Sequence, residues 1–261
     1  VNQPISPTQA PLATGFGGTV TYSIAPALPT GFTLDTSAGI IQGTSTTALS
    51  ATSYTLTGTA GSDTATLSVT LSVARADQST LNLVASPTTI KVNGTSDLST
   101  TGGTGTGAVS YTVQSGPCSV LDATVTGNGA GSCVVTATKA QDAGYSAVSS
   151  LPVTVTVGLA PQSKLSASAN PTTILVNGVS TLSSVGGSGS GSVSYQVLSG
   201  PCSISGASLT GTGPGSCKVT VSKAADTVYA RETSEPLTVT VDRAPQSELK
   251  VQASPTTVDV N

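Results

Sequence analysis

Four cysteines are the residues of this 261-residue chain whose type and spacing indicate a chemical role most clearly. Cys118 and Cys133 have the same spacing as Cys202 and Cys217. An even number of cysteines in a charge-poor chain indicates disulfides and an oxidising compartment, although four cysteines allow three pairings. The simplest pairing joins each cysteine to its near neighbour in the sequence. A redox-active pair needs a close CxxC-like spacing, and zinc sites of long spacing usually include histidine, which this chain lacks.

A second set of residues with chemical potential also occurs twice. It consists of a lysine, an aspartate and a tyrosine, present as Lys139, Asp142 and Tyr145 and again as Lys223, Asp226 and Tyr229. These residue types can bind a ligand or a cation, but a surface ion pair beside a tyrosine packed at a loop corner explains them more simply. An isopeptide crosslink from these lysines lacks a convincing asparagine partner with a catalytic acid. We therefore predict a structural Lys/Asp/Tyr motif.

Catalysis, metals and cofactors find little support in the sequence. There is no histidine and no pair of carboxylates in a recurring pocket motif, so we do not expect an enzyme. Calcium sites gather several carboxylates, whereas the predicted hinges carry Asp77 in one case and Asp242 with Glu248 in another. Structural calcium is therefore possible but not indicated, and no cofactor is expected. The glycine-rich runs 101–107 and 185–191 lack the lysine of a phosphate-binding loop, so we interpret them as plain hairpin connections.

The charge pattern excludes two classes of partner. Only 8% of the residues are charged and the net charge is −3, with no basic cluster for nucleic acid or for an anionic membrane. No run of eighteen apolar residues occurs, so we expect no membrane insertion in this segment. The chain starts at Val1 without a signal peptide, as expected for a processed product or a fragment.

An internal repeat of 84 residues organises the chain. Ser115-Gly116-Pro117-Cys118 returns as Ser199-Gly200-Pro201-Cys202, and the residues after each second cysteine match as well. The repeat predicts four segments: a cysteine-free module at 1–76, repeats at 77–160 and 161–244, and the first strand of a further repeat at 245–261. The hinges, which are Ala76-Asp77-Gln78-Ser79 and its two counterparts, are short and predict stiff joints.

Alternating apolar and polar residues predict strands throughout. In the first module they occupy 18–24, 32–34, 40–44, 53–58 and 65–73, with a turn at Gly61-Ser62-Asp63. In the first repeat they occupy 81–85, 88–92, 95–101, 108–115, 119–126, 132–138 and 151–157, and the second repeat has the same order. Asn93-Gly94 and Asn177-Gly178 predict turns. About seven strands per repeat indicate an all-β protein of tandem Ig-like β-sandwich domains arranged end to end. Each bridge then joins the end of one strand to a nearby later one, unlike the inter-sheet bridge of antibody domains.

Two resemblances accompany this pattern. The runs Tyr22-Ser23-Ile24, 28–35 and 39–44 make residues 18–73 resemble the Putative Ig, cadherin-like modules of bacterial surface proteins. Both repeats resemble the tandem bacterial Ig-like domains of very large secreted or surface-anchored proteins, on their Ser-Gly-Pro-Cys, Gly-Ser-Cys, Lys-Ala-x-Asp-x-x-Tyr and Val-Thr-Val motifs. The resemblance implies a stalk or adhesin spacer at the bacterial cell surface.

The last residues leave two readings open. A domain's first strand cannot form a sheet alone, so this segment is either truncated or donated to a neighbouring molecule through Val251, Pro255, Val258 and Val260. We predict a non-enzymatic stalk of a large bacterial extracellular adhesin or biofilm matrix protein. The alternatives are a self-assembling extracellular filament and a carbohydrate-binding or spacer module of a secreted enzyme. The expected partners are further copies of the repeats in cis or neighbouring subunits in trans, with any cell-surface or glycan ligand unspecified.

Overall fold

The computed structural model describes residues 1–252 except 6–7, 9–10 and 12–13. The described chain is all-β and forms three β-sandwich domains in tandem, which confirms the predicted fold class. Its residues group into two compact units, Val1–Gly158 and Leu159–Asn261. No helix of the described part is long and apolar enough to span a bilayer.

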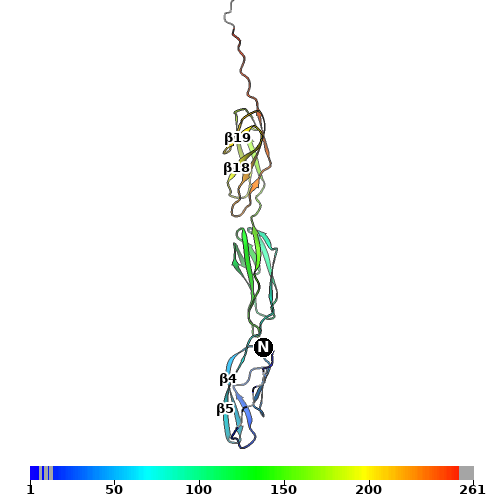
Figure 1. The fold of residues 1–261 in the computed structure, drawn as a ribbon, viewed down its shortest axis with the longest axis vertical. Coiled ribbons are helices and arrows are strands. Elements are labelled where there is room, and N and C mark those ends of the chain that lie inside the picture. The colour runs from blue at the N-terminus through cyan, green and yellow to red at the C-terminus, as the bar shows by residue number, and fades with distance from the viewer. Residues whose placement is uncertain (6–7, 9–10, 12–13, 253–261) are drawn as a thin grey trace, which may run out of the picture. The chain divides into compact units, whose positions relative to one another are not determined.

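The first module contains a three-stranded sheet and a hairpin, and Figure 1 labels β4 and β5 of this sheet. The sheet has the order β1 (Thr21–Ala25), β4 (Leu49–Ala60), β5 (Asp63–Val73), and the hairpin joins β2 (Phe32–Asp35) to β3 (Ile40–Gly43). Alternate residues of β4 point into the core, where Tyr54 and Leu56 are each only 4% exposed. The turn between β4 and β5 lies at the predicted place, and Gly61 adopts a φ of +62° there.

The first repeat is a sandwich of two sheets. Its strands are β6 (Leu81–Ser86), β7 (Thr89–Lys91), β8 (Thr95–Gly102), β9 (Val109–Ser115), β10 (Cys118–Leu121), β11 (Thr124–Gly127), β12 (Gly131–Lys139), β13 (Val148–Ser149) and β14 (Val153–Gly158). One sheet has the order β10-β11-β8-β6; the other contains β9, β12, β14 and β7, with β7 parallel to β14, and β13 beside β12. Apart from the short β7 and β13, this is the ABED and CFG arrangement of an Ig domain.

The second repeat has the same topology. Its strands are β15 (Leu165–Asn170), β16 (Thr173–Leu175), β17 (Val179–Gly186), β18 (Val193–Ser199), β19 (Cys202–Ser205), β20 (Ser208–Gly211), β21 (Gly215–Lys223), β22 (Glu232–Thr233) and β23 (Leu237–Asp242). Its sheets are β15-β17-β20-β19 and β16-β23-β21-β18, with β22 beside β21.

One predicted strand of the first repeat was wrong. Residues 119–126 form a hairpin, β10 and β11, instead of a single strand. Asp122 adopts a φ of +52° at the turn, a left-handed conformation that aspartate tolerates, and Gly206 takes the same place in the second repeat at +61°. The predicted Asn-Gly turns are present, with Asn93 and Asn177 at φ of +65° and +66°.

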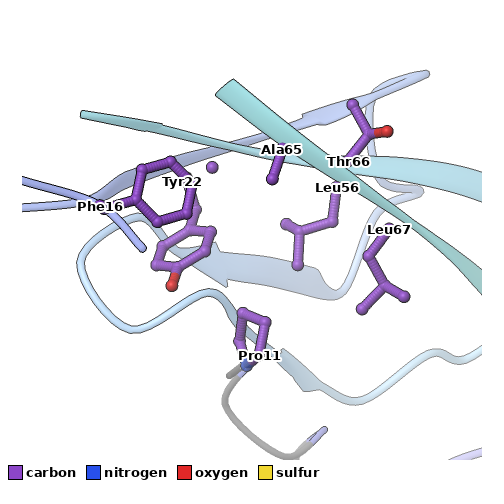
Figure 2. Close-up of a pocket in the computed structure, with 8 residues that line it drawn as sticks. Pro11, Phe16, Tyr22, Leu56, Ala65, Thr66 and Leu67 are labelled. Atoms are coloured by element: carbon purple, nitrogen blue, oxygen red, sulfur yellow. The ribbon is translucent and has the colours of Figure 1, made fainter. Parts of the chain in front are cut away.

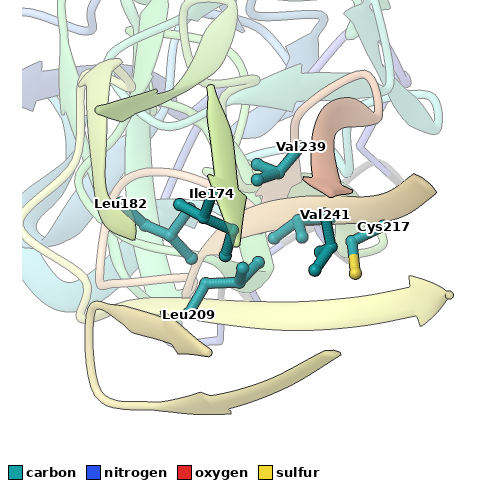
Figure 3. Packing of buried hydrophobic residues seen from close by; sticks show 7 residues of the cluster. Ile174, Leu182, Leu209, Cys217, Val239 and Val241 are labelled. Atoms are coloured by element: carbon teal, nitrogen blue, oxygen red, sulfur yellow. The ribbon is translucent and has the colours of Figure 1, made fainter. Parts of the chain in front are cut away.

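The core of the second repeat is built from aliphatic residues and one half of a disulfide. Buried side chains from five strands meet between the two sheets: Ile174, Leu182, Leu209, Cys217, Val219, Val239 and Val241 (Figure 3). Leu209, Cys217, Val219 and Val239 are fully buried. Tyr195, only partly buried, is the single aromatic side chain packed against this cluster. A core of such small side chains has limited apolar area to bury, so covalent bridging matters more for its stability.

Candidate functional site: the linker clamp of each repeat

Each repeat contains one disulfide. Cys118 is bonded to Cys133, and Cys202 to Cys217. The strands that carry them, β10 with β12 and β19 with β21, belong to opposite sheets. The expectation that these bridges are not inter-sheet bridges was therefore wrong, although they join the strands that correspond to D and F and so differ from the B–F bridge of antibody domains. The chain crosses from the sheet of β9 to the sheet of β10 within the two residues Gly116 and Pro117, so Cys118 already lies on the opposite sheet.

The recurring Lys/Asp/Tyr motif lies in a cluster of loops that we call the linker clamp. In the first repeat the clamp comprises Gln78, the 102–107 loop and residues 139–146. Gln78 is its centre, because Nε2 donates to the carbonyl oxygens of Ala140 (3.2 Å) and Ser146 (2.8 Å). Its Oε1 accepts a hydrogen bond from the Gly105 N–H at 3.1 Å. One side chain of the hinge thus ties two loops together.

Asp142 occupies the second position of the clamp. Its Oδ2 accepts hydrogen bonds from the N–H (2.6 Å) and the hydroxyl (3.1 Å) of Thr106. Its Oδ1 accepts hydrogen bonds from the N–H groups of Gly144 (2.9 Å) and Tyr145 (2.7 Å). These donors stabilise the ionised form and lower the pKa of Asp142 to about 2, with the Thr106 N–H as the largest cause. Both oxygens are occupied by protein donors, which explains this aspartate without a cation.

The predicted ion pair between Lys139 and Asp142 is not formed. Lys139 Nζ instead donates to the carbonyl oxygen of Gly103 at 3.0 Å, on the opposite loop. The glycine-rich run is also more than the plain hairpin we predicted, because it connects β8 to β9 and so crosses between the sheets. A Cβ atom at Gly105 would lie 2.6 Å from Asp142 Oδ2, so glycine is required for close packing against the clamp.

The second repeat reproduces the clamp. Gln162 Nε2 donates to the carbonyl oxygens of Ala224 (3.1 Å) and Ala230 (2.8 Å), and its Oε1 accepts from the Gly189 N–H (3.2 Å). Asp226 accepts from Ser190, Val228 and Tyr229, which lowers its pKa well below the ordinary range, the Tyr229 N–H contributing most. Lys223 Nζ donates to the carbonyl oxygen of Gly187 at 3.0 Å. Gln162 is only 8% exposed.

The clamp holds the backbone of the linker that precedes it. Ala76 pairs with Tyr145 in a parallel bridge, in which the Ala76 N–H donates to the Gly144 carbonyl at 2.9 Å and the Ser146 N–H donates to the Ala76 carbonyl at 2.9 Å. In the second repeat, Ala160 makes the corresponding bridge to Tyr229. The linker is therefore held by main-chain groups on either side of each tyrosine.

Within the first unit, the same loop also contacts the first module. The Ala48 N–H donates to the Ala143 carbonyl at 2.7 Å, and Arg75 Nε donates to the Asp142 carbonyl at 2.8 Å. A Cβ atom at Gly144 would lie 3.1 Å from the Thr46 carbonyl oxygen. A glycine at this position lets the first module approach the loop closely, whereas the second repeat has Val228 there.

We predict that Gly144→Val weakens this junction without unfolding the first repeat. The added side chain separates Ala143 from Ala48, and loss of one backbone hydrogen bond is worth about 1 kcal/mol. The Ala48 amide is expected to exchange its hydrogen roughly fivefold to tenfold faster. Val228→Gly, the converse change in the second repeat, is the matched control and should leave Ala48 unchanged. Equal exchange at Ala48 in Gly144→Val and the wild type would contradict the predicted contact.

The clamp aspartates also predict how stability depends on pH. Their folded pKa values lie below the ordinary value of about 3.9, so they stabilise the fold above that pH and lose this effect as the pH falls towards about 2. We expect the thermal midpoint to fall between about pH 5 and pH 2. Asp142→Asn with Asp226→Asn should lower the midpoint at pH 7 and flatten this fall. Asp35, whose pKa its bonds to Ser37 and Ala38 also lower, should account for part of the remaining slope. An unchanged slope in the double variant would contradict the assignment.

Sequence reasoning missed the two central glutamines. A signal was present, because a glutamine recurs at the same place in all three hinges, including Gln246. The tail residues are only partly described: Val251 is 85% exposed and lies outside any strand, while Pro255, Val258 and Val260 fall outside the described residues. Among the residues that the structure describes, no group of three or more His, Cys, Asp or Glu side chains is placed to hold a metal ion.

The two-sheet topology, the inter-sheet bridges and the repeated loops define tandem Ig-like β-sandwich domains. Residues 1–74 match the family model described as Putative Ig domain, which confirms the resemblance expected for the first module. No curated protein matches the chain. Disulfide-bonded domains of this kind are typical of extracellular proteins and usually have no catalytic role.

Several solved structures of tandem extracellular domains are similar to the chain. Human protocadherin-24 EC1-2 is 14% identical, with a TM-score of 0.28, over 56% of this chain and 84% of that chain. Invasin, a bacterial integrin-binding protein, is 17% identical, with a TM-score of 0.31, over 87% of this chain and 53% of that chain. Drosophila OTK extracellular domains 3-5 are 13% identical, with a TM-score of 0.34, over 94% of this chain and 92% of that chain.

Proposed function

We propose that this chain is a non-enzymatic stalk segment of a large bacterial extracellular adhesin or biofilm matrix protein. The observation that carries the proposal is the linker clamp, which recurs in both repeats with nearly the same distances. In an Ig domain, the loops at one end of the sandwich often bind ligands. Here two of those loops are bonded to each other and to the linker, as suits a spacer whose joints must stay fixed.

The surface chemistry supports the same role. The outer positions of the strands are largely Ser and Thr, and only 8% of the chain is charged, so the surface offers few charged groups for recognition of a partner. The disulfides suit an oxidising location outside the cell. Arrays of repeats that contact mainly their neighbours commonly supply length and rigidity.

The carbohydrate-binding alternative is less well supported. Sugar-binding surfaces usually present exposed aromatic rings, and the chain has 6 Tyr and 2 Phe, all within the described residues. Tyr54 and Phe32 are buried, and the other six aromatic side chains are half-buried. Their position favours packing over stacking against a sugar.

Small-angle X-ray scattering on chains of different repeat number tests the proposal. Inserting one extra copy of residues 161–244 should lengthen the largest dimension by about 40 Å, the length expected of a module with seven-residue strands and loops. The matched control carries the same insertion with alanine in place of its hinge glutamine, and should give a broader distance distribution. The stalk proposal would be overturned if the insertion added little to the largest dimension. It would also be overturned if the chain with the hinge glutamine gave a distance distribution as broad as that of its alanine control.

A second candidate is a self-assembling filament in which the C-terminal strand completes the sheet of a neighbouring copy. The specific observation is that Leu249 and Val251 are 91% and 85% exposed. Their counterparts one module earlier are Leu165, which is 1% exposed, and Ala167, which is partly buried, and two modules earlier Leu81 and Leu83 of β6 are only 2% and 8% exposed. Particles whose length increases with protein concentration would favour the filament over the stalk, provided that the Leu249→Lys variant forms shorter particles.

A further inference from the structure

Outside the linker clamp, the chain has an apolar groove in the first module and an exposed turn in the first repeat. The groove is lined by side chains that include Pro11, Tyr22, Leu56 and Leu67 (Figure 2). Its described lining contains no charged side chain, and the sequence neighbours of Pro11 lie outside the described residues. The groove therefore does not indicate the chemistry of a ligand, whereas the turn carries a specific chemical signal.

The turn that follows β7 contains a sequence for the attachment of a sugar to asparagine. Asn93-Gly94-Thr95 has the form Asn-x-Thr in which x is not proline, and this is the acceptor sequence for N-linked glycosylation. Within the sequence, one other asparagine is followed by a hydroxyl residue two positions later. In that case, Asn170-Pro171-Thr172, the intervening proline excludes the modification.

The folded turn presents this acceptor sequence at the surface. Asn93 and Thr95 are both exposed. Main-chain bonds hold the turn, because the Asn93 N–H donates to the Gly127 carbonyl at 2.8 Å and the Gly94 N–H donates to the Lys91 carbonyl at 2.8 Å. Within the described part of the chain, neither the Asn93 side-chain amide nor the Thr95 hydroxyl has a hydrogen-bond partner. A sugar on Asn93 therefore breaks no hydrogen bond of the fold.

The second repeat separates what the turn needs from what the modification needs. Asn177 has a φ of +66°, and its N–H donates to the Gly211 carbonyl at 2.8 Å, so the asparagine serves the left-handed turn in both repeats. The residue at the position of Thr95 is Val179, which is 52% exposed. The turn thus forms without a hydroxyl group at this position, and the threonine of the first repeat is not explained by the turn.

We propose that Asn93 is an N-glycosylation site, and that the second repeat lacks the modification because it has Val179 in place of Thr95. The reaction forms a bond between Asn93 Nδ2 and the anomeric carbon of a sugar. The bond from that carbon to the phosphate oxygen of an activated sugar breaks, and the phosphate leaves with the electron pair. One proton of the amide passes to a base of the transferase. The donor is a sugar diphosphate linked to a nucleoside or to a lipid, and both donors share this chemistry.

A glycan suits the surface of this chain. Only 8% of the residues are charged, so charge contributes little to solubility. An N-linked glycan is bulky and solubilising, and it needs a surface position such as this turn. The site is independent of the stalk role, since it depends on one turn of the first repeat.

Peptide mapping by mass spectrometry of the full chain, purified from its native source, tests the site. We expect the peptide that contains Asn93 to carry a sugar on this asparagine, and the peptide that contains Asn177 to carry none. A single sugar residue on Asn93 would identify a nucleotide-linked donor. An oligosaccharide attached as one block would identify a lipid-linked donor.

Three variants produced in the same source make the test specific. Thr95→Val copies the second repeat and should remove the sugar, whereas Thr95→Ser keeps the hydroxyl and should retain it. Val179→Thr is the matched converse change and should add a second sugar, on Asn177. Both positions are exposed, so the circular dichroism spectra of the variants should equal that of the wild type.

An unmodified Asn93 in the native chain would overturn the proposal. A sugar that persists in Thr95→Val would also overturn it, because the sugar would then not depend on the acceptor sequence. If Val179→Thr left Asn177 unmodified, the difference between the two repeats would not come from this residue, and the second part of the proposal would be wrong.

Discussion

Replacing Cys202 and Cys217 together by alanine is expected to lower the free energy of unfolding of the second repeat by about 3 kcal/mol. The bridge closes a loop with a sequence separation of 15, and its removal restores that loop's freedom in the unfolded chain. Cys217 has no exposed surface and packs among Val219, Val239 and Val241, so the bridge also fixes the contact between the two sheets.

Urea unfolding of the full chain, followed by tyrosine fluorescence and circular dichroism, measures this loss. Tyr195 packs against the core of the second repeat and reports on it directly. The matched control is Cys118→Ala with Cys133→Ala, which should destabilise the first repeat by a similar amount and leave the second unchanged. A loss below about 1 kcal/mol in both repeats would mean that the sandwiches are held by their aliphatic cores and need no bridge.

The fold was predictable because the sequence repeats its strand pattern. Alternation of apolar and polar residues located most strands of the first module and of the repeats within a few residues, and the Asn-Gly turns lie where they were expected. The 84-residue period required the same topology twice, and β6–β14 and β15–β23 have it. Such local patterns indicate that one face of a segment is buried, and burial of one face is the property by which a half-buried strand is recognised in a sequence.

The arrangement of the loops was not predictable in the same way. A hairpin with only two residues at its turn, such as Leu121–Thr124, looks like one continuous strand when its turn residues are Asp and Ala. The crossing from β9 to β10 takes only Gly116 and Pro117, so the sequence did not show that Cys118 lies on the opposite sheet. The Lys139–Asp142 pair looked like a local ion pair because the two residues are close in sequence. The partners that they actually bind lie 36 residues away, on a loop that sequence spacing does not place.

The glutamine of the clamp was missed for a related reason. Gln78 and Gln162 are uncharged, belong to a hinge and make contacts 61 to 68 residues away with backbone carbonyls. A side chain that bonds only to main-chain atoms leaves no complementary residue type in the sequence. Its recurrence in every hinge was the sole signal, and the structure gives that recurrence a physical cause.

Gln162→Ala is therefore expected to destabilise the second repeat by about 2–4 kcal/mol. The change leaves the Gly189 N–H and the Ala224 and Ala230 carbonyls without their partner, and each buried group left unsatisfied costs about 1–3 kcal/mol. Because Gln162 is only 8% exposed, water reaches these groups poorly. Hydrogen exchange at the Gly189 amide should accelerate before the rest of the repeat, since it loses its acceptor directly.

Gln246→Ala is the matched control for this prediction. Gln246 holds the same place in the last hinge but is exposed, so its replacement should change neither stability nor exchange. Gln162→Glu keeps the shape of the side chain and the acceptor for the Gly189 N–H, but it sets a carboxylate against two carbonyl oxygens. This variant should destabilise the second repeat at neutral pH. Its stability should partly recover in acid, where the carboxyl group is protonated. If Gln162→Ala were as stable as Gln246→Ala, the clamp would be a consequence of loop packing, and the rigidity of the joint would have to come from the linker backbone alone.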